Sequence, residues 1–360
     1  METQTKTQIE AKFNSYLEVV AEHNASDLHL CVGRPPILRI DGKLYPIAGE
    51  EKLSEQALLA ISKAILNSAQ QEKLEKEKQV DFSVDLHQKA RFRANVYWQK
   101  GYISAAFRLI PSKIRTLEEL NVTPVLYELT KSSQGFILIT GPCGHGKSTT
   151  LAALIDHINH TRQDHIITIE DPIEYVFDPD MCIIDQREVF QDAADFGTAL
   201  RAVFREDADV VMVGEMRDLE TISTAITAAE TGHLIFATLH TNDAAQTIDR
   251  MVDVFPAHQQ NQIRMQLAQN LLGIVSQRLV NRVDGGRIPA VEILYNNNAI
   301  SNLIREGKTH QINLVIETSR EQGMISLNHS LADLVKRGII SLEEAEAYST
   351  NKEELKILLR

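Results

Sequence analysis

Residues 135–148 read GFILITGPCGHGKS, and this stretch decides the fold of the chain. Its apolar beginning, 135–140, predicts a short buried strand. The residues that follow match G-x-x-x-x-G-K-[ST] at every fixed position. Glycines let such a loop turn tightly enough for several backbone N–H groups to point at phosphate oxygens, and a helix after the loop adds the positive end of its dipole. The stretch therefore predicts a strand, a phosphate-binding loop and a helix in that order.

The loop predicts contacts with a nucleoside triphosphate, ATP, and with Mg²⁺. Lys147 would place its charge between the β- and γ-phosphates, and the Ser148 hydroxyl would be a ligand of Mg²⁺. The residues expected to bind nucleotide are Gly141, Pro142, Cys143, Gly144, His145, Gly146, Lys147, Ser148 and Thr149. The alternative is a Gly-rich turn without a ligand, but such a turn needs neither the strand before it nor the helix after it.

Beyond the loop, short apolar runs alternate with helical periodicity. The clearest are a helix at 148–159 and strands at 166–169, 210–213 and 234–238. This alternation is typical of an α/β fold with a mostly parallel sheet. The last third of the chain, including 263–283 and 326–359, is predicted to be chiefly helical.

An acidic residue follows the predicted strand 210–213. Glu215 comes two residues after this strand, and a carboxylate in such a place can hold Mg²⁺ or its water. Because Gly214 and Glu215 stand where an aspartate is usual, we predict a water-mediated contact with the metal. The alternative is a surface glutamate in a turn.

Three more carboxylates, Glu170, Asp171 and Glu174, follow the strand 166–169. Together they concentrate negative charge, which is costly without a cation or a shared proton. We therefore expect Glu174 or Glu170 to polarise an attacking water molecule. The sequence does not choose between the two, and a solvated loop is the alternative.

Two histidines, His233 and His240, bracket the strand 234–238. An isolated histidine is more often structural than catalytic. Their position beside the nucleotide-binding strands favours a relay of the γ-phosphate state to a neighbouring subunit by hydrogen bonding.

The first third of the chain has the alternating apolar and polar pattern of half-buried strands. Its other expected elements are helices at 6–22 and 53–78, a strand at 28–32 and a hairpin turn at Asp41-Gly42. A second hairpin is indicated by Lys100-Gly101. If these two residues form the turn, paired residues have numbers that sum to 201, and every pair on one face is apolar.

The same register places Arg93 opposite Arg108 on the other face. Two like charges directly opposite each other are destabilising unless an anion lies near them. One interpretation is a phosphate-sensing cluster that includes Arg91. The other is that these side chains extend into solvent or pair with aspartate and glutamate.

Composition excludes several classes of protein. The chain has 360 residues, of which 43% are hydrophobic and 24% charged, with a formal net charge of −12. No basic run indicates a nucleic-acid partner, and no apolar run approaches the ~18 residues of a transmembrane segment. The amino terminus lacks the pattern of a secretory signal, so we expect a cytoplasmic protein. Three dispersed cysteines form no zinc motif and no even disulfide framework.

Taken together, the motifs resemble those of the type IV pilus retraction ATPases (PilT-like proteins) of the secretion-ATPase superfamily. The resemblance extends from Ser26 to Gly338. Its signatures are a Walker A loop at 141–148, an acidic box at 169–175, an atypical Walker B segment at 213–218, a histidine box at 231–241 and AISNLIRE at 299–306, which is similar to the AIRNLIRE of retraction motors.

The resemblance implies a PAS-like α+β domain at 1–112, a linker at 113–122, a RecA-like ATPase core at 123–295 and a helical region at 296–360. It also implies a homohexamer with ATP bound between the domains, whose amino-terminal arginines Arg91, Arg93 and Arg108 reach the nucleotide. Such a ring acts on an inner-membrane platform protein at the pilus base, depolymerising pilin and driving twitching motility.

Three residues depart from the family pattern: Cys143 and His145 replace the usual Thr and Ser, and Ser301 replaces an arginine. Backbone groups form the cradle, so we expect ATP binding to survive the first two changes. Ser301 leaves open an accessory role beside a paralogous retraction ATPase. Further alternatives are a pilus-assembly or secretion ATPase, a RecA-like nucleic-acid translocase, and a ring member that binds ATP without hydrolysing it.

Overall fold

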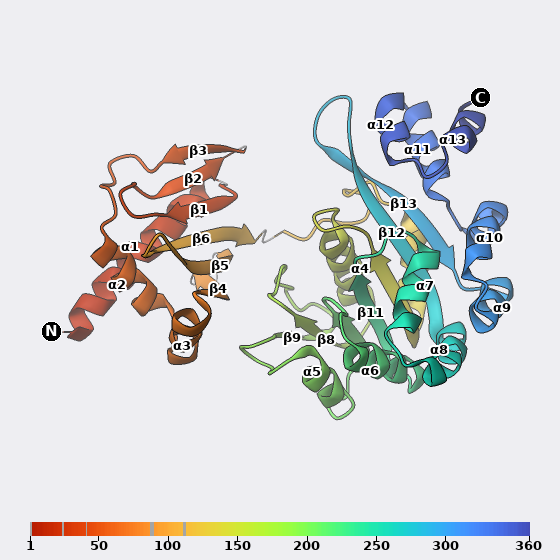
Figure 1. Ribbon diagram of the computed structural model, residues 1–360, viewed down its shortest axis with the longest axis horizontal. Helices are drawn as coiled ribbons and strands as arrows, with labels where there is room; N and C mark the ends of the chain where they lie inside the picture. Colours follow the sequence, from red (N-terminus) through yellow and green to blue (C-terminus); the bar gives the residue numbers. More distant parts are fainter. Residues whose placement is uncertain (1, 24, 41, 87–89, 111–112) are drawn as a thin grey trace. The chain divides into compact units, whose positions relative to one another are not determined.

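The computed structural model describes residues 2–23, 25–40, 42–86, 90–110 and 113–360. The chain divides into two compact units, Met1–Lys113 and Ile114–Arg360. Figure 1 labels the helices and strands of both units.

Unit 1 is an antiparallel six-stranded sheet with helices packed on one face (Figure 1). Its sheet order is β3-β2-β1-β6-β5-β4. The strands are β1 (Asp27–Leu30), β2 (Ile37–Ile40), β3 (Lys43–Pro46), β4 (Gln79–Leu86), β5 (Ala90–Gln99) and β6 (Tyr102–Ile110). The helices are α1 (Glu2–Glu22), α2 (Glu55–Ile65) and α3 (Ser68–Glu77). Phe13 of α1 contacts Phe107 of β6 with ring centroids 5.0 Å apart, which places the core between helices and sheet.

The predicted β5–β6 hairpin is confirmed. Lys100 and Gly101 have φ angles of 49° and 84°, as a two-residue turn between antiparallel strands requires. Trp98 pairs with Ile103, and Arg93 pairs with Arg108, as the sum of 201 predicts.

Unit 1 differs from the prediction in one helix, and one expected turn lies partly outside the described residues. The single helix expected at 53–78 is two helices, because the Asn67 side chain accepts a hydrogen bond from the Gln70 N–H and begins α3 with a capping box. The expected turn at Asp41-Gly42 includes Asp41, which lies outside the described residues. Around it, β2 and β3 pair antiparallel, with Ile40 opposite Lys43.

Unit 2 is an α/β structure around a seven-stranded sheet of order β13-β12-β7-β11-β10-β8-β9. All neighbouring strands are parallel except β12 and β13. The strands are β7 (Gly135–Thr140), β8 (His165–Glu170), β9 (Ile183–Glu188), β10 (Val210–Val213), β11 (Leu234–Leu239), β12 (Leu271–Asn281) and β13 (Arg287–Tyr295).

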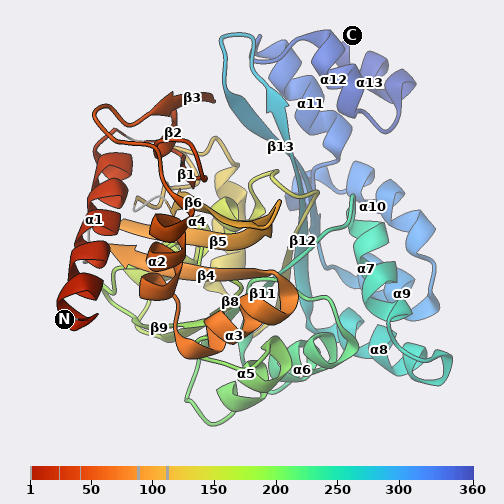
Figure 2. The same cartoon turned by 60° about the vertical axis from the view of Figure 1, so that its left-hand side comes forward.

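Helices cover both faces of this sheet (Figure 2). One face packs against α4 (Lys147–Thr161). The other packs against α5 (Phe196–Val203), α6 (Leu219–Glu230), α7 (Ala244–Asp253) and α8 (Ala257–Asn270). Because the parallel strands β7, β11, β10 and β8 are in register, their carboxyl ends meet at one edge, and the loops that follow them meet there too.

The helix predicted over 263–283 is wrong in its second half. The helix α8 ends at Asn270, and β12 begins at Leu271 as the first strand of a β-hairpin. The apolar run Leu271–Val275 fits a buried strand as well as a buried helix, since periodicity alone does not separate the two.

After the hairpin the chain is helical, as predicted. The helices are α9 (Asn298–Glu306), α10 (Ile312–Thr318), α11 (Leu327–Lys336), α12 (Leu342–Tyr348) and α13 (Lys352–Leu359). The last three gather beside the turn end of the β12–β13 hairpin, where Leu331 and Leu355 join Val280 and Ile288 in one core (Figure 1). Among the described residues, no helix is long and apolar enough to cross a bilayer.

Candidate functional site

The predicted strand, phosphate loop and helix are present as β7, 141–146 and α4. Gly141 has φ 142°, and a Cβ there would lie 2.4 Å from the carbonyl oxygen of Gln277. Gly146 has φ 80°, and its Cβ would lie 2.8 Å from the Gln277 Nε2. At Gly141 only glycine fits, because the clash is with backbone, and at Gly146 the positive φ strains any other residue. Cys143 and Gly144 form the exposed tip of the loop.

Gln277 of β12 is a buried contact of the loop that the sequence did not reveal. Its Oε1 accepts a hydrogen bond from the Thr150 hydroxyl at 2.8 Å, and its Nε2 donates to the His145 carbonyl oxygen at 2.8 Å. Two residues further along β12, the Leu279 N–H donates to His145 Nδ1 at 2.9 Å, which adds a third contact. Strand β12 therefore fixes both the loop and the first turn of α4.

Lys147, His240 and Glu215 form a continuous chain of contacts at the strand ends. The Lys147 Nζ donates to the Pro142 carbonyl oxygen at 3.0 Å and lies 3.3 Å from His240 Nδ1. His240 Nε2 lies 3.0 Å from Glu215 Oε1. Since the lysine ammonium can only donate, Nδ1 accepts and Nε2 carries the proton toward the carboxylate. Burial lowers the pKa of Lys147, and the nearby Cys143, Glu215 and Glu174 oppose this effect.

Glu215 is held in its ionised form. Burial alone would raise its pKa, but a hydrogen bond from Arg217 and the neighbouring His240 outweigh burial, and the pKa falls below its ordinary value. Arg217 lies 2.6 Å from Glu215 through its Nε. The result is a fixed negative charge facing the lysine of the phosphate loop.

The donor set fits Mg²⁺ bound together with a nucleotide. Among the described residues the Ser148 hydroxyl has no hydrogen-bond partner, and Glu215 supplies a carboxylate beside the loop. Mg²⁺ usually keeps several waters and takes few protein ligands when substrate phosphates complete its shell. The described part of the chain has no group of three or more His, Cys, Asp or Glu side chains that could hold a metal ion.

The two candidates for the water-polarising carboxylate differ sharply. Glu170 is 5% exposed, and burial raises its pKa to about 7. Glu174 is exposed, and its negative charge acts on the Lys147 ammonium. The expected cluster of carboxylates at this strand end is therefore divided, with Glu170 inside the protein and Glu174 at the solvent.

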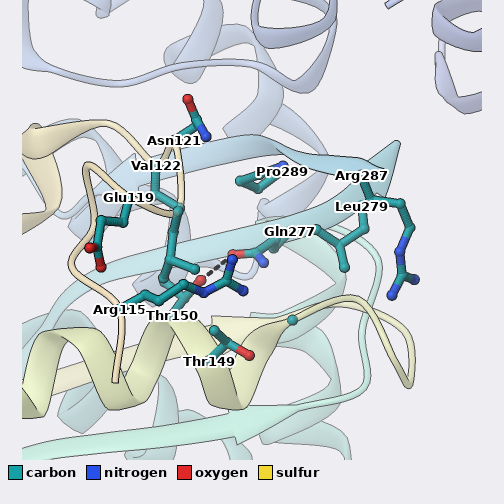
Figure 3. A pocket seen from close by; sticks show the side chains of 12 residues that line it. Arg115, Glu119, Asn121, Val122, Thr149, Thr150, Gln277, Leu279, Arg287 and Pro289 are labelled. Carbon is teal, nitrogen blue, oxygen red and sulfur yellow. Dashed lines mark hydrogen bonds between the residues drawn. The ribbon is translucent and has the colours of Figure 1, made fainter. Parts of the chain in front are cut away.

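A cavity of about 290 Å³ lies beside the phosphate loop (Figure 3). Its floor includes Gly146, Thr149 and Thr150, and its walls come from 115–122 and from the β12–β13 hairpin. Arg115 points into this cavity (Figure 3).

The structure does not bring His233 to this group. His233 precedes β11 and His240 follows it, so the two histidines lie at opposite ends of this strand. The His233 carbonyl oxygen accepts a hydrogen bond from the Gly135 N–H at 3.0 Å, and its Nδ1 lies 3.0 Å from the Ala228 carbonyl oxygen. These contacts are those of a structural histidine, and the relay expected of His233 toward another subunit stays a prediction.

The arginines of unit 1 are placed as the register requires, but their environments differ. Arg108 donates to Asp27 at 2.9 Å, and Arg91 lies 3.4 Å from Asp85, so pairing with aspartate holds for these two. Arg93 is exposed, and no hydrogen bond or ion pair to it is found among the described residues. Of the three, Arg93 is the side chain with its guanidinium available for an anion.

Ser301, the departure in the AISNLIRE segment, lies half-buried on α9. Its hydroxyl donates to the Ala268 carbonyl oxygen at 2.9 Å and lies 2.9 Å from Asn296 Oδ1. Serine therefore connects α9 to α8.

Comparisons with known proteins agree with this geometry. The model of the family described as type II/IV secretion system protein matches residues 2–286. The chain is 47% identical to the type IV pilus retraction ATPase PilT of Pseudomonas aeruginosa, covering 90% of this chain and 94% of that one. It is 44% identical to a twitching motility protein of Neisseria gonorrhoeae, covering 89% and 86%.

A solved structure extends the similarity to three dimensions. The pilus retraction motor PilT with bound ADP superposes with a TM-score of 0.88 at 46% identity, covering 96% of this chain and 98% of that one.

Proposed function

The chain belongs to the family of type II/IV secretion system proteins, and from this premise we propose that it is the ATP-hydrolysing motor of type IV pilus retraction and twitching motility. One observation carries the proposal. Contacts from Lys147 through His240 to Glu215 connect the phosphate loop to the carboxylate that would hold Mg²⁺. They occur in a protein that is 47% identical to a retraction ATPase over most of its length.

We propose that the phosphates of ATP are bound by the backbone of 141–146 and by Lys147, with the nucleoside in the adjacent cavity. Ser148, and Glu215 through water, would hold Mg²⁺, which neutralises charge on the phosphates when bound. Glu174 would polarise the attacking water, since its carboxylate is exposed near Lys147. His240 would exchange contacts between Lys147 and Glu215 as the phosphates change.

Unit 1 would be a PAS-like domain and the core of unit 2 a RecA-like domain, assembled in a homohexamer. Arg93, with Arg108 and Arg91 beside it, would stabilise the transition state on a neighbouring subunit, a contribution of ~10³–10⁵ in rate for such arginines. The ring would act on a platform protein of the inner membrane from its cytoplasmic side. A net charge of −12 argues against a nucleic-acid substrate.

The test is a pilus-retraction assay in a strain that lacks the gene, complemented with wild-type protein or with Arg93→Ala. Wild type should restore retraction. Arg93→Ala should fail and should lower ATP turnover roughly 10³-fold while nucleotide affinity changes little. Wild-type protein that restores no retraction, or an Arg93→Ala variant with normal turnover, would refute the assignment.

An accessory retraction ATPase is the second candidate, and Ser301 favours it. The chain is also 35% identical, over 97% of its length, to the type IV pilus ATPase PilU of Pseudomonas aeruginosa. Expression in a strain that lacks the main retraction motor separates the two: an independent motor restores retraction there, and an accessory one does not.

A further inference from the structure

The segment that carries Glu174 has no regular secondary structure, yet three of its backbone amides donate to side chains of neighbouring strands. The Ile173 N–H donates to Glu188 Oε2 at 3.2 Å, and the Glu174 N–H donates to Glu170 Oε2 at 3.2 Å. The Phe177 N–H donates to Gln186 Oε1 at 2.9 Å. Buried amides need such partners, and here they come from two neighbouring strands rather than from the loop itself.

The strand register explains why these acceptors lie together. In the parallel pair β8–β9, Glu170 is opposite Glu188 and Thr168 is opposite Gln186. Residues two apart share a face of a strand, so all four side chains point toward the loop 171–177. The carboxyl ends of both strands thus form a platform beneath Glu174.

Two buried glutamates side by side are costly unless each oxygen has a donor. Besides the Glu174 amide, Glu170 accepts from the Thr168 hydroxyl at 2.6 Å and from Gln186 Nε2 at 3.2 Å. Glu188, which is 2% exposed, accepts from Gln191 Nε2 at 2.5 Å as well as from the loop. All of these donors belong to the protein, so both carboxylates are directed at the loop and away from solvent.

The loop is also connected to the helix of the phosphate loop. Tyr175, next to Glu174, has its hydroxyl 2.8 Å from Thr149 Oγ1, beside Ser148. Its carbonyl oxygen accepts from Gln186 Nε2 at 2.7 Å. With its own amide on Glu170 and its neighbour on α4, Glu174 has a fixed backbone while its side chain remains at the surface.

We propose that Glu170 and Glu188 are positioning residues that hold the backbone of Glu174, the proposed base, in place. This inference rests on the proposed ATPase function. It separates two roles that the sequence left open, because a base needs a carboxylate that can take a proton, whereas a backbone amide needs only an oxygen that accepts its hydrogen bond.

Glutamine replacements distinguish these roles, since glutamine keeps an acceptor oxygen but cannot take the proton. Turnover, the KM for ATP, ADP affinity and thermal unfolding are measured on the full chain. Glu174→Gln should lose roughly 10²–10⁴-fold in kcat with ADP affinity intact. Glu170→Gln and Glu188→Gln should each lose no more than about 10-fold, the equivalent of one hydrogen bond.

Alanine removes the acceptor itself. Glu188→Ala should lower kcat on the order of 10²-fold through misplacement of Glu174, with KM and ADP affinity unchanged. The matched control is Asp195→Ala, which removes a carboxylate that accepts the Thr198 N–H at the start of α5 and leaves the loop intact. This control should lose some thermal stability and keep its kcat.

Each outcome bears on one claim. A Glu170→Gln variant as inactive as Glu174→Gln would overturn the inference and make Glu170 the base. A folded Glu188→Ala variant with normal kcat would overturn the positioning role of Glu188. A wild-type protein without ATP turnover would refute the proposed function itself, and this inference with it.

Discussion

The phosphate loop at 141–148 and the loop at 171–177 lie at the same edge of one sheet, but they keep their shapes by different means. The phosphate loop depends chiefly on glycines at positive φ and on backbone groups, and Gln277 of β12 adds a side-chain contact to it. The loop that carries Glu174 depends on the buried side chains of Glu170 and Glu188 and on the half-buried Gln186. The first arrangement leaves a local signature in the sequence. The second needs residues from a neighbouring strand, and those have no fixed spacing from the loop.

The largest expected effect comes from removing the positive charge of the phosphate loop. Lys147→Ala removes the ammonium that lies between Pro142 and His240, and turnover should fall to the detection limit, a loss of at least ~10³-fold. A steady-state ATPase assay measures it. Normal turnover in this variant would show that the loop does not bind the transferred phosphate.

A second prediction addresses the backbone of the same loop. Gly141→Ala would place a Cβ 2.4 Å from the Gln277 carbonyl oxygen, and overpacking of this kind costs roughly 1–3 kcal/mol. Nucleotide affinity should fall with stability, because the loop must move away from β12. Isothermal titration with ADP and thermal unfolding measure the two effects.

Gly144→Ala is the matched control for that prediction. Gly144 also has positive φ, 77°, but no atom lies within 4 Å of the position that a Cβ would take there. It should carry only the backbone strain of about 1–2 kcal/mol. Equal loss of ADP affinity in the two variants would contradict the role given to the contact with Gln277.

The third prediction sharpens the contrast between the loops. Gln186→Ala removes the acceptor of the Phe177 amide and the donor to the Tyr175 carbonyl oxygen. The replacement also removes the donor to Glu170 Oε1, and we expect the loss of these three hydrogen bonds to lower kcat roughly 10-fold or more, with ADP affinity unchanged. Changes in the phosphate loop should therefore alter binding, and changes beneath 171–177 should alter turnover alone. A Gln186→Ala variant with weakened ADP binding would remove this distinction.

The smallest expected effect concerns pH. Burial lowers the pKa of His145 below its ordinary 6.5, and Arg278, Arg287 and Lys147 lower it further. As pH falls below 6.5, the unfolded chain takes up a proton that the imidazole of the folded protein resists. The contribution of His145 to the free energy of unfolding is therefore complete above pH 6.5 and is lost progressively as the pH falls below that value.

His145→Ser, which restores the residue usual in the family, should make stability less dependent on pH between 7.5 and 5.5. Denaturant unfolding at the two pH values measures the difference. An identical acid loss in variant and wild type would show that His145 does not contribute to it.

The features that the sequence predicted correctly are those with a local pattern, and those that it missed depend on contacts between distant segments. The phosphate loop, the parallel strands and the register of Arg93 opposite Arg108 depend on local patterns, and the structure contains them. Gln277 was missed because it is far from the loop in sequence and meets it only through strand pairing. The hairpin after Asn270 was predicted as helix because a short apolar run has no distinctive period.

The site residues divide in the same way. Lys147 was found from its motif, and Glu174 could not be separated from Glu170, since burial decides between them and burial depends on β9. Glu188 has no motif of its own. Its signal, a second glutamate in register with Glu170 across a parallel pair, becomes visible only after the sheet order is known.

Strand β12 has a mechanical consequence. It lies between β7 and β13 and extends over 11 residues, at about 3.3 Å for each residue. Near its middle it contacts the phosphate loop through Gln277, and at its end Asn281 donates to Glu344 of α12 at 2.6 Å. From Gly273 to Ser276 the strand pairs with β7 and β13, and from Gln277 to Asn281 it continues paired with β13 alone. A displacement of α12 would therefore be passed along this hairpin strand to the side chain that contacts the phosphate loop.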